Sequence, residues 1–139
     1  MSLQRRPVAH RIMVALAWLV AAGILVQAAL AGQGWFVTPE LLVLHGGVGH
    51  GVLTLAVVLA GLLLVYQRVS LGSVLGVLMV LALVVQTGLG YAGLRGELDL
   101  ASSLHIPLGV LVFGASIALA IVLSTGSRTT GDAPTAGGT

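Results

Sequence analysis

The stretch Leu41–Gly51 reads LLVLHGGVGHG and holds two of the four histidines of the chain. It places His45 inside an otherwise apolar run, with Gly49 one helical turn further on. Near the other end of the chain, Leu104–Gly109 reads LHIPLG, and His105 is again followed by a glycine four residues later. The motif H-x-x-x-G therefore occurs twice, each time near the start of a long apolar segment.

The repeat extends upstream of both histidines, to a Val-Gln pair. Gln27 lies 18 residues before His45, and Gln86 lies 19 residues before His105. Each half of the chain therefore reads V-Q, a short connecting segment and then H-x-x-x-G. Internal similarity at a period of about 60 residues indicates two copies of one supersecondary unit, here a pair of helices. We expect the two histidines to meet in the folded protein.

The composition excludes a soluble domain. Only 7% of the 139 residues are charged and the mean hydropathy is +1.11, whereas soluble domains carry about 25% charged residues. Four apolar stretches each approach the roughly 20 residues that a membrane-spanning helix needs. They cover residues 12–31, 41–66, 73–91 and 104–123. Backbone inside a bilayer forms helices or a closed barrel, so these continuous stretches predict an all-α integral membrane four-helix bundle built from a tandem two-helix repeat.

The bundle is expected to occupy residues 12–123. A basic leader at residues 1–11 precedes it, and a disordered Gly/Thr/Ser-rich tail at residues 124–139 follows it. The basic start, the apolar run and the sequence Ala29-Leu30-Ala31 also resemble a signal peptide with its cleavage site. Retention of this segment is favoured, because it carries Gln27 and so belongs to the repeat.

The fourth span is expected to begin at about Leu104. Ser102 or Ser103 would then cap the helix. Pro107 would fall in its first turn, where a missing backbone N–H costs little.

The arginines predict the orientation in the membrane. With both chain ends on the cytoplasmic side, five arginines lie on that side and only Arg95 lies on the other. The five are Arg5, Arg6, Arg11, Arg68 and Arg128. This asymmetry satisfies the positive-inside rule and predicts a multi-pass protein of the bacterial cytoplasmic membrane with both termini cytoplasmic. The arginines are spread over loops, so no nucleic-acid partner is expected.

His45 and His105 are the candidate metal ligands. Both lie near the outward-facing starts of their spans, at a similar depth. Ionisable residues within spans usually face the bundle interior, and the second and fourth helices of a short-looped bundle lie diagonally opposite. We expect one haem b per chain between them, with both imidazoles on the iron and with Gly49 and Gly109 leaving room for the flat macrocycle. The alternative is that each histidine only ties two helices together.

Three further residues are candidates for contacts to the haem. Gln27 and Gln86 lie at about the level of the histidines, where they would hydrogen bond with a propionate or with a ligand's ring N–H. The alternative is a glutamine pair that bonds across the bundle. Arg95 would pair with a propionate carboxylate, or would be a solvated loop charge near Glu97 or Asp99.

The other two histidines are not expected to be ligands. His50 lies five residues from His45, about 140° around the helix, and its repeat counterpart is Val110. An interhelical hydrogen bond or a contact to Thr54 is expected for it. His10 lies in the basic leader and is expected to be solvated.

The positions of His45 and His105, together with the segment 86–90 (QTGLG), resemble one four-helix half of the heme A synthase family. Each half in that family carries one histidine on its second helix, one on its fourth and a Q-x-x-L-G stretch on its third. Small uncharacterised four-helix haem-binding membrane proteins related to that family share the same pattern. The resemblance covers residues 12–123 and implies a haem site, with oxidation of a haem methyl group in a synthase-like enzyme.

The chain departs from that family at several positions. The resemblance would require an acidic residue three positions before the first histidine, where Leu42 stands, and an arginine after it, where Gly46 stands. The outer-loop cysteine pair of some members is absent, since the chain has no cysteine. These departures weaken the expectation of haem-methyl oxidation more than the expectation of haem binding.

Three functions remain as hypotheses. The favoured one is a small b-type cytochrome for electron transfer, since two histidines fill both axial positions of the iron. Besides membrane lipid, its partner would be a quinone or another redox protein. The alternatives are a compact heme A synthase-like enzyme, in which a homodimer would imitate the eight-helix parent, and a non-haem scaffold or assembly subunit.

Overall fold

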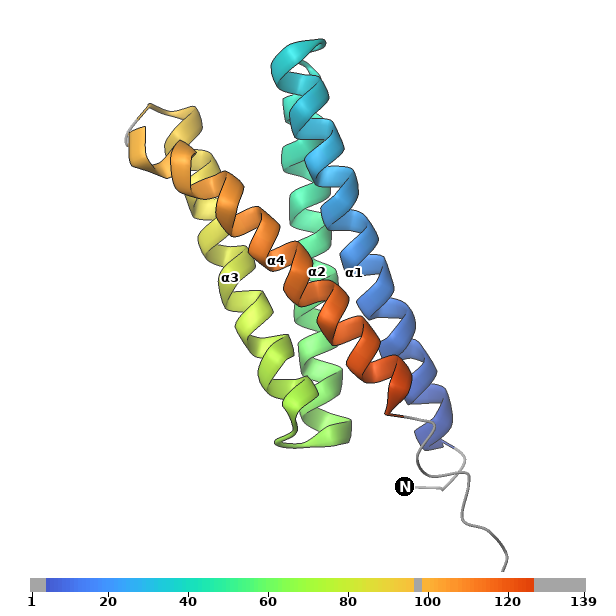
Figure 1. Ribbon diagram of the computed structural model, residues 1–139. Helices are drawn as coiled ribbons and strands as arrows, with labels where there is room; N and C mark the ends of the chain where they lie inside the picture. Colours follow the sequence, from blue (N-terminus) through green and yellow to red (C-terminus); the bar gives the residue numbers. More distant parts are fainter. Residues whose placement is uncertain (1–4, 97–98, 127–139) are drawn as a thin grey trace, which may run out of the picture.

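The described part of the chain folds into four long α-helices (Figure 1). The computed structural model describes residues 5–96 and 99–126. Within these ranges, the helices are α1 (Arg5–Phe36), α2 (Leu41–Gln67), α3 (Leu71–Leu94) and α4 (Asp99–Thr125). All four are long and apolar enough to cross a membrane. The predicted all-α, multi-pass architecture is therefore confirmed.

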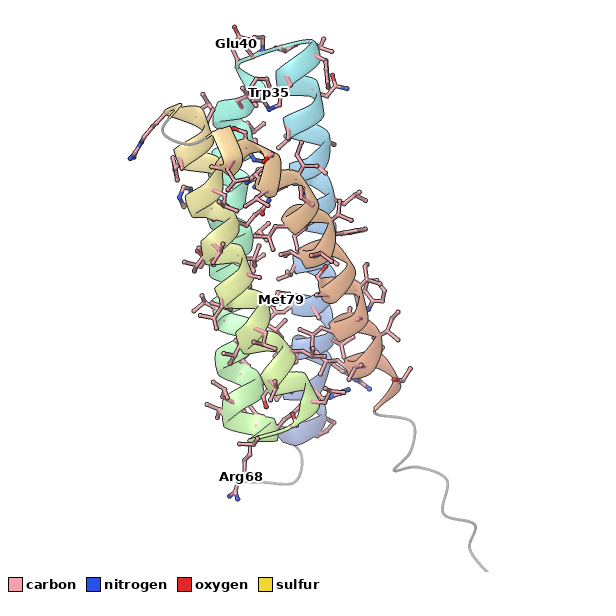
Figure 2. The ribbon with its side chains drawn as sticks, turned by 60° about the vertical axis from the view of Figure 1, so that its left-hand side comes forward. Trp35, Glu40, Arg68 and Met79 are labelled. Carbon is pink, nitrogen blue, oxygen red and sulfur yellow. The ribbon has the colours of Figure 1, made fainter. Side chains whose placement is uncertain are left out.

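The helices form an up-and-down bundle. The packed pairs are α1 with α2, α2 with α3, α3 with α4, and α1 with α4, so α2 and α4 lie diagonally opposite, as expected. The start of α1 and the end of α4 lie at the same end of the bundle (Figure 1). Arg68 lies at that end too, whereas Trp35 and Glu40 lie at the other (Figure 2). We call the latter the histidine end, because α2 and α4 begin there.

The two halves of the chain bury equivalent positions. In α2 the buried residues are Val52, Ala56, Leu59, Ala60 and Leu63. In α4, sixty positions later in each case, they include Val112, Ser116, Leu119, Ala120 and Leu123. Buried residues of α1 include Met13, Ala17, Val20 and Ile24, and those of α3 include Gly72, Gly76, Met79 and Leu83, each 59 positions later. The two-helix repeat is therefore visible in the faces that the helices bury.

In each helical hairpin, a glycine lies at the contact between the two helices near the histidine end. A Cβ atom on Gly34 would lie 2.8 Å from Cγ of Leu42, and one on Gly93 would lie 2.6 Å from Oγ of Ser102. These contacts are also equivalent in the repeat. Small residues let two helix backbones approach closely in a membrane, and here they set the approach of α1 to α2 and of α3 to α4.

Several predicted helix boundaries are wrong. Helix α1 begins at Arg5 and continues to Phe36, so most of the predicted leader and part of the segment 32–40 between the first two predicted spans are helical. At 1.5 Å per residue its 32 residues extend about 48 Å, beyond a hydrocarbon core of about 30 Å. Polar ends can therefore continue the helix outside the apolar layer. The predicted tail begins inside α4, which ends at Thr125, and residues 127–139 lie outside the described part.

The start of α4 also differs from the prediction. The helix begins at Asp99, so neither serine caps it at Leu104. Instead, Oγ of Ser103 donates to the carbonyl of Leu100 inside the helix, at 2.9 Å. Pro107 lies in the third turn, where its missing N–H leaves the carbonyl of Ser103 without its usual helical donor.

The turn between α2 and α3 contains a capping box. Oγ of Ser70 accepts from the backbone N–H of Ser73 at 3.2 Å, and Oγ of Ser73 accepts from the N–H of Ser70 at 2.8 Å. Before this box, Arg68 has φ 55° and ψ −141°, a backbone conformation that favours glycine. Arg68 is the non-glycine residue with positive φ among the described residues.

Candidate functional site

His45 and Gln27 bond to each other twice, between α1 and α2. Nε2 of Gln27 donates to the backbone carbonyl of His45 at 2.7 Å. Nδ1 of His45 lies 2.9 Å from the backbone carbonyl of Gln27. Because a carbonyl only accepts, Nδ1 carries the proton and Nε2 keeps its lone pair. We call this reciprocal pair of bonds a Gln–His clamp.

A second Gln–His clamp joins α3 to α4. Nε2 of Gln86 donates to the carbonyl of His105 at 2.8 Å, and Nδ1 of His105 donates to the carbonyl of Gln86 at 3.0 Å. The two clamps use the same atoms at nearly the same distances, so the V-Q … H-x-x-x-G repeat corresponds to a repeated contact. The described residues form no glutamine pair across the bundle. Each glutamine accepts from a histidine ring N–H, as one of the expectations had it, but through its backbone carbonyl, while its side-chain amide donates to the histidine backbone.

The two glycines of the motif lie directly against the glutamine amides. A Cβ atom on Gly49 would lie 2.7 Å from Nε2 of Gln27, and one on Gly109 would lie 3.0 Å from Nε2 of Gln86. Residues i and i+4 share a helix face, so each glycine uncovers the carbonyl of the histidine one turn earlier. The room that the sequence interpretation reserved for a macrocycle is therefore taken by the glutamine side chains.

The two histidines meet across the diagonal of the bundle, as the repeat predicted. Their ring centroids lie 6.3 Å apart, and the ring planes are inclined by 70°. Nothing among the described residues hydrogen bonds with Nε2 of His45 or of His105. If each Nε2 lay about 2 Å from one shared metal ion, on opposite sides, the two ring centroids would be separated by about 6 Å. The observed spacing suits two ligands of one ion.

The level of the histidines is less tightly packed than the rest of the bundle. Both histidines and both glutamines are half-buried. From this level to the histidine end, the described residues classed as buried are Gly34 and Ala101. Oε1 of Gln86 is buried and has no hydrogen-bond partner among the described residues. This orphaned acceptor beside His105 could accept from a further donor, such as a water or a bound group.

His50 lies apart from the histidine pair, on the flank between α2 and α3. Its Nδ1 donates to the carbonyl of Gly46 at 2.9 Å, and its Nε2 lies 3.4 Å from the hydroxyl of Tyr91 on α3. The interhelical contact expected for His50 is therefore confirmed. The contact to Thr54 is to the backbone rather than the ring, because Oγ1 of Thr54 donates to the carbonyl of His50 at 2.9 Å.

Arg95 and His10 lie at opposite ends of the bundle. Arg95 follows the last residue of α3, and its Cζ atom lies 6.0 Å from the ring centroid of Tyr91. Glu97 and the side chain of Asp99 lie outside the described part, so the pairing with them stays a prediction. His10 lies inside α1, and its Nε2 is buried without a partner among the described residues. His10 is half-buried rather than fully solvated as expected, because its Nε2 packs against the bundle.

Tyr91 is the residue that the sequence interpretation missed. It lies five residues beyond Gln86, just as His50 lies five residues beyond His45. That matched offset places both side chains about 140° around their helices from the clamps. The offset is a signal that could have paired them.

No family model, no curated protein and no solved structure matches the chain. No group of three or more His, Cys, Asp or Glu side chains gathers within the described ranges. The candidate site therefore depends on two histidines alone, and its chemistry follows from the geometry of that pair.

Proposed function

We propose that the protein is a small integral-membrane b-type cytochrome that binds one haem b between His45 and His105 and transfers electrons. The observation that carries the proposal is the meeting of two imidazoles at 6.3 Å across the bundle. Each is anchored through Nδ1, which leaves the Nε2 lone pairs for a metal. Histidines that ligate metals commonly hold the other ring nitrogen in this way.

The residues around the pair fit a haem in four respects. Imidazole nitrogen suits iron, and the spacing of the rings suits two axial ligands of one ion. The orphaned Oε1 of Gln86 offers an acceptor beside one ligand. The scarcity of buried side chains at this level is what a bundle needs if a flat ring is to enter between its helices.

The chain's own groups would orient and tune the haem. The Gln–His clamps would fix the tautomer and the direction of both imidazoles. Arg95 is proposed to hold a propionate carboxylate. A haem held by both histidines would supply one-electron transfer rather than oxygen binding.

A non-haem scaffold is a second candidate, and the clamps themselves favour it. Each histidine already makes two hydrogen bonds with the adjacent helix. Polar side chains that bond across helices stabilise membrane bundles by about 1 kcal/mol each. On this hypothesis the motif ties two hairpins together and binds nothing.

The orientation is also part of the proposal. Arg68 lies at the same end of the bundle as the start of α1 (Figure 2), and this end would face the cytoplasm by the positive-inside rule. The haem would then lie near the outer face of a bacterial cytoplasmic membrane. A homodimer is one assembly that would bring two such sites together.

Haem analysis of the purified protein tests the proposal. We expect one haem per chain, with the spectrum of six-coordinate low-spin iron, and an extracted porphyrin with the mass of haem b. A modified porphyrin would instead favour the heme A synthase-like enzyme suggested by the sequence resemblance. Protein purified from haem-replete membranes without any haem would favour the scaffold.

A further inference from the structure

A polar pair faces outward from the bundle between α2 and α3. His50 is exposed, Tyr91 is 44% exposed, and their ring centroids lie 6.1 Å apart with a tilt of 40°. Both lie within helices long and apolar enough to cross the membrane. Side chains exposed on such a helix meet lipid, where a histidine is costly and usually has a function.

The second half of the bundle provides an internal control for this pair. The positions equivalent to His50 and Tyr91 are Val110 and Gly32. The clamps and the buried faces are repeated, but this pair is not. The fold that the repeat specifies therefore forms without a polar pair on its flank, and a structural role does not explain the pair.

The pair offers three groups that can bind a hydroxylated ring. Nδ1 of His50 donates to the carbonyl of Gly46, so Nε2 is an acceptor. The hydroxyl of Tyr91 approaches that nitrogen only to 3.4 Å, longer than the roughly 2.7–2.9 Å of a strong bond, so both groups can turn toward a third partner. The ring of Tyr91 supplies an aromatic face, with the Arg95 guanidinium carbon 6.0 Å from its centroid.

We infer that His50 and Tyr91 bind the ring of a membrane quinol. A ligand that reaches this flank must come through the lipid, and a quinol is the lipid-dissolved electron carrier whose ring bears hydroxyls. Nε2 of His50 would accept a hydrogen bond from one hydroxyl, with the ring against Tyr91. The choice of a quinol depends on the proposed electron-transfer function. Helix α2 carries both His45 and His50, so about one helix diameter, or 10 Å, would separate the two sites.

Quinol binding to the purified protein in nanodiscs tests this inference. The probe is a benzoquinol with a short alkyl chain and a photoreactive group, kept reduced by excess dithionite, and affinity is measured from the concentration dependence of photolabelling. His50→Val reproduces the residue of the equivalent position and should weaken binding about tenfold, the effect of one lost hydrogen bond. His50→Gln retains an acceptor and should restore part of the affinity. Tyr91→Phe should weaken binding several-fold.

Tyr66→Phe is the matched control, because Tyr66 is a similarly exposed tyrosine, at 39%, near the opposite end of α2. It should bind the probe like the unaltered chain. Photolabelling should mark segments 46–54 and 87–95. Equal affinity in all variants, or labelling confined to other helices, would overturn the inference, and helicity by circular dichroism shows that each variant is folded.

The same experiment separates this inference from the proposed cytochrome. If the protein binds haem normally but quinol binding is unchanged by substitution of His50 and Tyr91, the quinol site is wrong and the cytochrome proposal stands. If quinol binding depends on the pair but no haem is bound, the cytochrome proposal is wrong and the ring site stands. Haem content is therefore measured on the same samples.

Discussion

Substitution of Gly49 by alanine tests the Gln–His clamp directly. The new Cβ would lie 2.7 Å from Nε2 of Gln27, closer than carbon and nitrogen can approach, so the amide must leave the carbonyl of His45. Gly47 is the matched control two residues away, because a Cβ there meets nothing within 4 Å. Both alanines gain about the same helix propensity, on the order of 1 kcal/mol. That gain cancels when the two variants are compared.

The difference between the variants is therefore the cost of opening one clamp. Hydrogen bonds between membrane helices contribute about 0.6 kcal/mol on average and up to about 1.7 kcal/mol. The displaced amide also loses part of its solvation, so Gly49→Ala should be about 1–2 kcal/mol less stable than Gly47→Ala. Gly109→Ala should cost less, because its Cβ would lie 3.0 Å from Nε2 of Gln86 and a shift of a few tenths of an ångström relieves the contact.

Reversible unfolding in mixed detergent micelles, followed by circular dichroism, measures these differences. In a chain that also carries Gln27→Ala, Gly49→Ala should stabilise the protein as much as Gly47→Ala does, because no glutamine amide remains for the new Cβ to displace. Such coupling in a double-mutant cycle is expected for residues in contact. If Gly49→Ala stabilises the protein as much as Gly47→Ala does, then Gly49 is not needed to form the Gln–His clamp.

Three further predictions concern other parts of the molecule. Arg68→Gly should stabilise the fold by about 1 kcal/mol or more, because it removes a side chain from a positive-φ position. A lower free energy of unfolding in micelles would contradict this prediction. In cells, an impermeant maleimide added from outside should label Trp35→Cys and not Arg68→Cys, and the reverse labelling would refute the orientation. The chain has no native cysteine to interfere. Arg95→Ala should lower haem retention or shift the midpoint potential while the low-spin spectrum remains; unchanged occupancy and potential would remove Arg95 from the site.

The sequence was enough to predict the bundle and the meeting of the two histidines. Apolar length specified the four helices, and the duplicated V-Q … H-x-x-x-G pattern placed His45 and His105 at matching depths on diagonal helices. These features depend on composition and spacing, which are visible in one dimension. The same repeat appears in the structure as equivalent buried faces.

What the sequence did not reveal is how the polar groups pair. The expected bond with a histidine ring N–H is made by the backbone carbonyls of Gln27 and Gln86. Their side-chain amides reach histidine backbone carbonyls that Gly49 and Gly109 uncover. A helical carbonyl already has a partner within its own helix, so nothing in the spacing shows that it accepts a second donor. Tyr91 was missed for a similar reason, because its partner His50 lies on another helix.

The positions of the helix ends also could not be predicted from the sequence. The serines near position 103 resembled a cap, yet α4 begins at Asp99. Ser103 lies inside the helix, where its hydroxyl donates to the carbonyl of Leu100. Local signals for a cap and for an interior serine are alike. In the structure this part of α4 packs on α3, where Gly93 approaches Ser102.

The most direct test of the proposed haem site is the iron coordination of four proteins. They are the unaltered chain and its His45→Ala, His105→Ala and His50→Ala variants. Electron paramagnetic resonance and absorption spectra distinguish low-spin iron with two axial ligands from high-spin iron with one. We expect low-spin haem in the unaltered chain and in His50→Ala, and high-spin haem or no haem in the other two. Low-spin haem retained in both His45→Ala and His105→Ala, or its loss in His50→Ala alone, would contradict the assignment of the ligands.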